Sequence, residues 1–207
     1  MMKVYDFEGF PNPARVRIAL KEKGLFDSVE FVSINVPEGE HRKAAFREKN
    51  PSATVPVLEL EDGTTIAECS AITEYLDQLT GEPQLTGKTP KERAVIAMMQ
   101  RRAEAGLFDA VGTYFHHATP GLGAELETYQ CAEWGRHQKT RAEATMRYLD
   151  GVLADQPYIA GKDFSVADIT VYTGLGFADF AGVDIPDGCE NLAHWRAKMD
   201  SRPSIAN

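Results

Sequence analysis

The chain has 207 residues, of which 43% are hydrophobic and 26% charged, so it is long enough to bury a substantial core. Its formal net charge of −9 argues against nucleic-acid binding, because phosphate recognition needs basic patches. The three widely spaced cysteines form no C-x-x-C motif, which favours a reducing compartment over a disulfide scaffold. The opening residues hold no apolar signal segment and no apolar run approaches membrane-spanning length, so we expect a cytoplasmic protein without membrane association.

The first eighty residues alternate between strand-like and helix-like segments. A strand is predicted at 3–7, followed by a helix from about Pro13 to Lys23, with Asn12 as its cap. The Asp62-Gly63 step predicts a hairpin between two further strands. In chain order the other predicted segments are a strand at 29–34, a short helix at 41–49, strands at 57–60 and 64–67, and a helix at 72–79 that Gly81 ends. This order is typical of a thioredoxin-like unit.

Residues 81–90 form the one predicted linker, with two glycines, two prolines and little apolar content. Every later segment predicts helix. The expected segments are 91–117, as one bent helix or two, a loop at 119–123, then 126–153, 165–180 and a closing helix around 192–199. Ser165 and Asp168 have the spacing of a capping box. We therefore expect two domains, 1–80 and 91–207, the second all helical.

The segment from Asn50 to Asp77 carries the clearest chemical signal. Proline cannot donate to a strand ladder, and a cis bond at Pro56 would leave the backbone N–H and C=O of Val55 open to an outside peptide. After the hairpin, the run Glu68-Cys69-Ser70 brings a carboxylate and helix-start amides to the same end of the sheet. Free amides attract a carboxylate and Glu68 attracts an ammonium, which suits a zwitterionic head group with a peptide tail.

These residues resemble the glutathione-binding signature of the cytosolic glutathione transferases. The resemblance covers essentially the whole chain, since residues 1–25 are similar to the family's opening strand and helix, and 165–175 to a helix start of its second domain. The run YFHHATPGLG at 114–123 resembles more narrowly the Gtt-type transferases of fungi and bacteria. The family implies a thioredoxin-like N-terminal domain, an all-α C-terminal domain, an active site between them and a homodimer.

The resemblance assigns the γ-glutamyl end of glutathione to the start of the third helix. Glu68 would hold the ammonium, and the amides of Cys69 and Ser70 would hold the carboxylate. Cysteine stands here where the family usually has serine. Because a thiol is a weak donor, the backbone amide or Ser70 must supply that contact. The alternative is that Glu68 and Ser70 merely cap a helix.

The rest of the tripeptide would lie along the hairpin. Val55, beside Pro56, would exchange backbone hydrogen bonds with the cysteinyl part, as a peptide added to a strand edge. His41, and after it Arg42, align with basic positions that the family uses for the glycyl carboxylate. The alternative for both is a solvated basic residue on a short exposed helix.

The residue that usually activates the glutathione sulfur is missing. The loop at 6–13 contains no hydroxyl or thiol, and Tyr5 lies within the strand, where we expect a core position. Lowering a thiol pKa by about two units takes roughly 2.7 kcal/mol. A helix N-terminus supplies roughly 0.3–2 kcal/mol, and one hydrogen bond to a charged group about 1.5–3 kcal/mol. A helix N-terminus and one such hydrogen bond together can therefore supply the free energy needed to lower the thiol pKa by about two units.

The first helix offers such donors. Pro11 and Pro13 have no N–H, so we expect the free amides to be those of Asn12, Ala14 and Arg15. Asn12 can also donate through its side-chain amide. We therefore expect Asn12 to take part in activating the thiol.

In the Gtt-type group a water held by the second domain is thought to replace the missing residue, and the resemblance places the histidine of that site at His116. One turn earlier, where a hydroxyl would help, the chain has Gly112, so the water would rest on His116 alone or on His117 or Thr119. The alternative is that His116 and His117 stabilise the carbonyls of a helix end. Tyr114 and His117 would line the pocket for the second substrate.

We therefore expect a glutathione transferase that conjugates small hydrophobic electrophiles, with glutathione as co-substrate and neither metal nor other cofactor. Three alternatives stay open: a non-catalytic glutathione-binding or interaction protein, a thiol–disulfide reductase or glutathione peroxidase, and a glutathione-dependent isomerase or dehalogenase, all of the same fold. The lack of a cysteine near the first helix disfavours the reductase. The sequence does not discriminate the isomerase.

Overall fold

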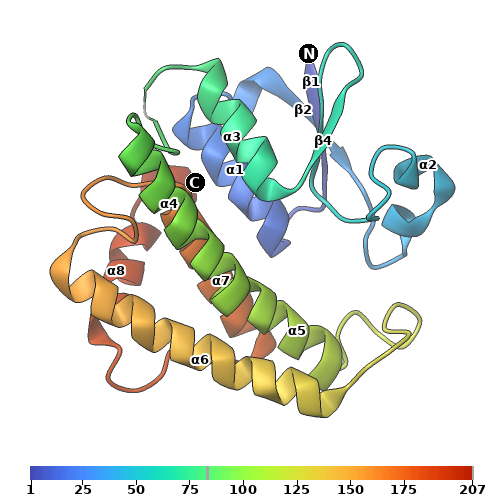
Figure 1. The fold of residues 1–207 in the computed structure, drawn as a ribbon. Helices are drawn as coiled ribbons and strands as arrows, with labels where there is room; N and C mark the ends of the chain where they lie inside the picture. The colour runs from blue at the N-terminus through green and yellow to red at the C-terminus, as the bar shows by residue number, and fades with distance from the viewer. Residues whose placement is uncertain (83, 207) are drawn as a thin grey trace. The chain divides into compact units, whose positions relative to one another are not determined.

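The computed structural model of the protein describes residues 1–82 and 84–206 (Figure 1). Pro83, which falls in the predicted linker, and Asn207, at the end of the predicted second domain, lie outside the described residues. The chain divides into two compact units, one from Met1 to Gln84 and one that begins at Leu85.

The first unit is built on a four-stranded sheet in the order β2-β1-β3-β4. Its elements in chain order are β1 (Met2–Asp6), α1 (Pro11–Glu22), β2 (Val29–Ser33), α2 (Ala44–Arg47), β3 (Val57–Glu59), β4 (Thr65–Ala67) and α3 (Cys69–Leu79). β1 runs parallel to β2 and antiparallel to β3, and β3 runs antiparallel to β4. This is the predicted thioredoxin-like order, so the fold prediction for this half is confirmed.

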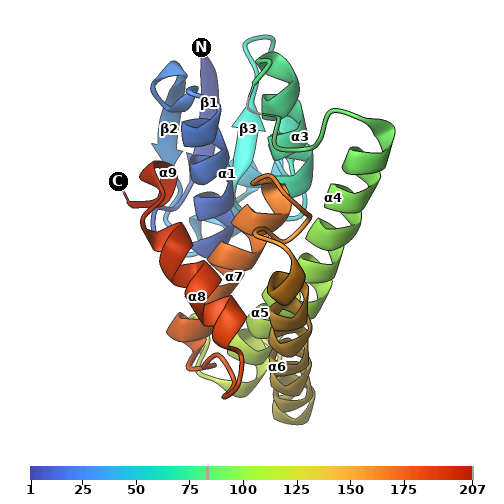
Figure 2. The same ribbon diagram turned by 90° about the vertical axis from the view of Figure 1, so that its left-hand side faces the viewer.

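Both longer helices of this unit cover the same face of the sheet. Figure 2 shows α1 and α3 side by side on it. Val4 and Leu58 point from the sheet into the apolar layer between them, and both are fully buried. At the far ends of the two helices, Lys23 donates to the carboxylate of Asp77 over 2.9 Å, and both side chains are almost completely buried. The burial and this ion pair hold α1 and α3 together.

The second unit is all helical, as predicted. Its elements are α4 (Pro90–Ala103), a π-helical segment (Glu104–Phe108), α5 (Asp109–Ala118), α6 (Ala132–Asp155), α7 (Val166–Ala181), α8 (Glu190–Asp200) and α9 (Pro203–Ala206). The run predicted over 91–117 is thus one continuous path with a π segment inside it. Gly106 in that segment lies so close to α6 that a Cβ there would sit 2.5 Å from the Thr145 hydroxyl. α7 is buried on most sides and packs against α4, α5 and the π segment.

Several predicted boundaries differ from those in the structure. α1 begins at Pro11 rather than Pro13, with Phe10 as its N-cap, so Asn12 lies inside the first turn and does not cap it. α3 ends at Leu79, as predicted, with the extended Thr80 between it and Gly81, but it begins at Cys69 instead of 72. α6 begins at Ala132 instead of 126, because side chains of α5 and the following loop hold residues 119–131 in a different path.

The capping box at the start of α7 is confirmed. The carboxylate of Asp168 accepts hydrogen bonds from the amide and hydroxyl of Ser165 and from the amide of Ile159, at 3.0, 2.9 and 2.9 Å. Asp168 is fully buried.

Across residues 1–82 and 84–206, no helix combines the length and apolar character needed to span a membrane.

Candidate functional site

The hairpin entrance has the geometry that the sequence suggested. The Val55-Pro56 peptide bond is cis. The pairing of β3 with β1 runs from Glu59 to Val57, where it ends opposite Tyr5. Val55 therefore lies just beyond the ladder, at the position where an added peptide strand would continue it.

Glu68 stands at the start of α3 in an unusual backbone conformation. Its φ of 67° lies in the left-handed region, which costs a non-glycine residue free energy and is concentrated at functional sites. Its exposed side chain makes no capping hydrogen bond to the helix. The first intrahelical bond is donated by Ile72 to the Glu68 carbonyl, so the amides of Ser70 and Ala71 precede it. Glu68 therefore occupies the N-cap position without the side-chain hydrogen bond that the alternative interpretation required.

The Cys69 thiol faces α1 instead of its own helix start. The side chain is buried, and Sγ lies 3.4 Å from both the carbonyl and the side-chain oxygen of Asn12. The thiol thus links the starts of α3 and α1. None of the three cysteines, all of which lie among the described residues, forms a disulfide.

The start of α1 offers fewer backbone donors than predicted. Ala14 donates its amide to the Phe10 carbonyl at 3.0 Å, and Arg15 lies in the regular part of the helix. The expectation of free amides at Ala14 and Arg15 is therefore wrong. Both prolines fit into the first turn, where no N–H is required, so the helix starts early and uses those amides itself. In this turn only the amide of Asn12 is left for a ligand.

The side chain of Asn12 adds a second kind of donor. Its oxygen accepts from Arg15 Nη1 at 3.3 Å and from the Cys69 thiol at 3.4 Å. An amide whose oxygen is used as the acceptor keeps both hydrogens of Nδ2 for another partner. Arg15 is itself buried, which fixes the orientation of Asn12. Asn12 thus presents a backbone N–H and a side-chain NH₂ where most glutathione transferases are expected to place a hydroxyl or thiol.

Tyr5 does not fill that place. It lies in β1 with 9% of its surface exposed, and its hydroxyl donates to Glu59 at 2.9 Å. The prediction that Tyr5 belongs to the core is confirmed.

His41 is buried, contrary to the alternative of a solvated side chain. It lies in a 3₁₀ turn (Glu40–Arg42) with 7% exposure. Its Nδ1 is buried without a hydrogen-bond partner among the described residues. Burial, reinforced by the positive charges of Arg42 and Arg47, lowers the pKa of His41 below its usual value. The ring is therefore neutral at pH 7, and it offers a ligand a hydrogen bond but not a charge.

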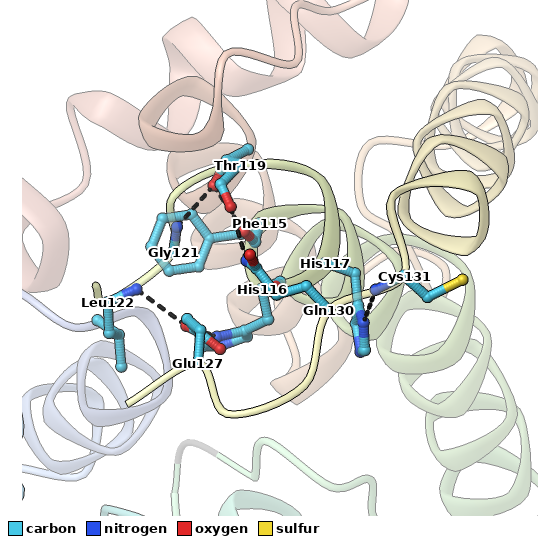
Figure 3. A network of polar contacts seen from close by, with 9 residues as sticks. All are labelled: Phe115, His116, His117, Thr119, Gly121, Leu122, Glu127, Gln130 and Cys131. Carbon is cyan, nitrogen blue, oxygen red and sulfur yellow. Dashed lines mark hydrogen bonds and ion pairs between the residues drawn. The ribbon is translucent and has the colours of Figure 1, made fainter. Parts of the chain in front are cut away.

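The two histidines at the end of α5 contact the loop that follows (Figure 3). His116 Nδ1 lies 2.6 Å from the Glu127 carboxylate, and His117 Nδ1 accepts the Cys131 amide at 3.1 Å. Other groups satisfy the helix end, since Thr119 donates to the Phe115 carbonyl and Gln130 to the His116 carbonyl. Those two carbonyls therefore have hydrogen-bond donors other than the histidine rings.

The other predicted pocket residues lie on α5 as well. Tyr114 is partly exposed, and the Lys139 ammonium lies 5.3 Å from the centre of its ring. His117 is three residues further on and shares that face of the helix. At Gly112, a Cβ would lie 3.3 Å from the ring of Phe177, so a larger residue needs that ring to shift.

Glu127 is the contact that sequence reasoning missed. It lies eleven residues after His116 in an irregular loop, where no periodicity relates one side chain to another. Among the described residues, no group of three or more His, Cys, Asp or Glu side chains is arranged to hold a metal ion.

Two family models match the chain. Residues 11–79 match the N-terminal domain of glutathione S-transferases and residues 132–198 match the C-terminal domain. The protein is 57% identical to Glutathione S-transferase 2 of Saccharomyces cerevisiae over 204 residues, which cover 99% of this chain and 88% of the yeast protein. The chain belongs to the glutathione S-transferase family.

Solved structures of this family show how close the relationship is. The crystal structure of Gtt2 from Saccharomyces cerevisiae is 56% identical and matches with a TM-score of 0.97, covering 99% of this chain and 98% of the other. A glutathione S-transferase domain-containing protein of Marinobacter aquaeolei is 63% identical, again with a TM-score of 0.97, over 98% and 99% of the two chains. The predicted membership in the family and the similarity to its Gtt-type members are confirmed.

Proposed function

We propose that this glutathione S-transferase binds glutathione at the starts of α1 and α3 and conjugates it, through its sulfur, to small hydrophobic electrophiles. The observation that carries the proposal is Asn12, which presents two kinds of hydrogen-bond donor where the usual hydroxyl or thiol is missing. In the reaction the thiol loses its proton to solvent, the thiolate attacks an electrophilic carbon, and a C–S bond forms as a leaving group such as chloride departs.

Glutathione would be held by its charged ends and its backbone. Glu68 takes the γ-glutamyl ammonium, and the α3 amides together with the exposed Ser70 take the neighbouring carboxylate. Val55, which is joined to Pro56 by the cis bond just before β3, pairs with the cysteinyl backbone. His41 contributes a neutral donor to the glycyl carboxylate.

The energetics of activation are sufficient without a hydroxyl. A hydrogen bond to a charged group contributes about 1.5–3 kcal/mol, and a helix N-terminus adds roughly 0.3–2 kcal/mol. The roughly 2.7 kcal/mol that two pKa units require lies within this range. Asn12 is thus proposed as a catalytic residue that stabilises the thiolate, with Cys69 and Arg15 orienting its side chain.

His116 is proposed as a second catalytic residue, which holds the water that receives the thiol proton. Its Nδ1 is engaged with Glu127, and 43% of its side chain is exposed. Tyr114 and His117 are proposed to contact the electrophile. We further propose a cytoplasmic homodimer active in detoxification, which uses glutathione as co-substrate and needs neither metal nor other cofactor.

The proposal is tested by turnover with glutathione and an activated chloronitroarene, followed through the absorbance of the thioether product. We expect saturable glutathione-dependent turnover. Firm glutathione binding without turnover on a panel of aryl halides, epoxides and unsaturated carbonyls would identify a non-catalytic binding protein instead.

A further inference from the structure

The loop at 119–131 is built around one carboxylate. Glu127 Oε1 accepts from the Leu122 amide at 2.9 Å and lies 2.6 Å from His116 Nδ1 (Figure 3). Its side chain is only 10% exposed. Gly121 makes room for it, because a Cβ at that position would lie 2.3 Å from Oε1 and 2.7 Å from the carboxyl carbon. The loop therefore places this carboxylate against His116 specifically.

The partner of each histidine decides which ring nitrogen carries its proton. An ionised carboxylate can only accept, so the short contact with Glu127 requires a hydrogen on Nδ1 of His116. The neutral ring then has its free lone pair on Nε2. Nδ1 of His117 accepts an amide hydrogen from Cys131, so it carries none. The neutral ring of His117 has its hydrogen on Nε2.

Two adjacent histidines are thus held in opposite tautomers. Nε2 of His116 is an acceptor, able to hold a water through one of its hydrogens and to take a proton from it. Nε2 of His117 can only donate while its ring is neutral. A side chain that removes a proton from water must be of the first kind.

We propose that Glu127 is a positioning residue that fixes His116 with Nε2 as the proton acceptor, and that this selects His116 over His117 as the base. The proposal rests on the proposed role of His116 in activating glutathione. Glu127 itself contacts neither substrate nor the reacting sulfur in this account and acts only through the ring.

The test reads tautomers directly. The protein is labelled with ¹⁵N-histidine, and the two ring nitrogens of each histidine are correlated with the ring protons at a pH where the rings are neutral. His116→Gln and His117→Gln assign the signals. In the wild type we expect a protonated Nδ1 in His116 and a protonated Nε2 in His117. This measurement is made on the wild type and does not depend on how a Glu127 variant folds.

Three substitutions then test whether the hydrogen-bond acceptor at Glu127, and not its negative charge, determines the tautomer of His116. Glu127→Leu removes the acceptor, and we expect mixed tautomers at His116 and a loss in kcat of tenfold or more, with little change in KM for glutathione. Glu127→Gln keeps an oxygen that can accept from Nδ1, so most of the Nδ1-protonated tautomer of His116 and most of the wild-type kcat should be retained. Glu125→Gln, at an exposed glutamate of the same loop, is the matched control and should change neither.

The possible failures are distinguishable. An Nε2-protonated His116 in the wild type, or a tautomer that Glu127→Leu leaves unchanged while His116→Ala lowers kcat, overturns the role of Glu127 alone. A different outcome is that the His116 tautomer responds to Glu127→Leu as expected, but neither Glu127→Leu nor His116→Ala changes kcat. That outcome overturns the proposed role of His116, and with it the inference.

Discussion

The starts of α4 and α7 in the second unit satisfy their backbone amides differently from the starts of α1 and α3 in the first. In the second unit, Thr89 accepts from the Glu92 amide and Glu92 accepts from the Thr89 amide, which completes a capping box on α4. α7 has the second such box at Ser165 and Asp168. In the first unit, neither Phe10 before α1 nor Glu68 before α3 makes a side-chain cap.

Because α6 and α8 of the second unit also begin without a side-chain cap, a missing cap alone does not identify a ligand site; at α1 and α3 it accompanies the other features of the proposed glutathione site. A capping side chain contributes about 0.5–2 kcal/mol to stability, and α1 and α3 forgo it. Glu68 also adopts a positive φ. Donors left without a cap are available to an anion, so the free energy lost in the unliganded protein is regained when glutathione binds.

The largest effect on stability is expected at the capping box of α7. Asp168→Ala leaves three buried donors without their acceptor, each costing about 1–3 kcal/mol, so we expect a loss of roughly 3–9 kcal/mol in the free energy of unfolding. Urea unfolding measures it. Glutathione affinity of the folded fraction should be unchanged. A loss below 1 kcal/mol would contradict the structural importance of this cap.

The same residue predicts a dependence of stability on pH. Burial, only partly offset by hydrogen bonds from Ile159 and Ser165, raises the pKa of Asp168 to about 6. A folded-state pKa above the unfolded value means that the contribution is fully present below pH 3.8 and is lost as pH rises to about 6. At 1.36 kcal/mol per unit this amounts to about 3 kcal/mol.

The measurement compares wild type with Asp168→Asn, which does not titrate. The difference in unfolding free energy, wild type minus variant, should fall by about 3 kcal/mol between pH 3.8 and 6 and stay level above that. A difference that is constant or rises with pH would show that the hydrogen bonds outweigh burial.

A smaller effect is expected at the start of α3, which has no side-chain cap, and it concerns glutathione binding instead of stability. Glu68→Gln removes the charge that meets the γ-glutamyl ammonium, so glutathione affinity should fall at least tenfold, about 1.4 kcal/mol. Calorimetric titration measures the affinity. Because Glu68 makes no capping bond, the unfolding free energy should change by less than about 0.5 kcal/mol. Glu74→Gln, on the exposed face of the same helix, is the control and should alter neither.

Equal affinity in Glu68→Gln and the wild type would remove Glu68 from the site. A large loss of stability would instead restore its interpretation as a structural cap, and the comparison between the two units would fail.

The features that sequence reasoning predicted are those governed by local rules. The Ser165–Asp168 box, the Asp62-Gly63 hairpin and the Val-Pro step before β3 each follow from the chemistry of a few neighbouring residues. The start of α1 was placed two residues late because Pro13 is as acceptable at N3 as at N1, so proline alone does not define the first residue.

The features it missed depend on contacts between distant segments. The burial of His41 is set by tertiary packing, although the residue occurs in a charged segment. The link from Cys69 to Asn12 joins two helix starts 57 residues apart. The contact of Glu127 with His116 depends on the path of a loop, which no pattern of apolar residues encodes.

The central claim is that the uncapped start of α1 activates glutathione through Asn12. Its most direct test is an ultraviolet difference titration of glutathione bound to the wild type and to Asn12→Ala, which follows thiolate absorbance as the pH is varied. We expect a bound thiol in the wild type that ionises about two units below the free value near 8.5. In Asn12→Ala its pKa should rise by about one unit, equivalent to roughly 1.4 kcal/mol, with affinity changed by less than about threefold. Identical thiol pKa values in the two proteins would contradict the claim and assign activation to groups other than Asn12.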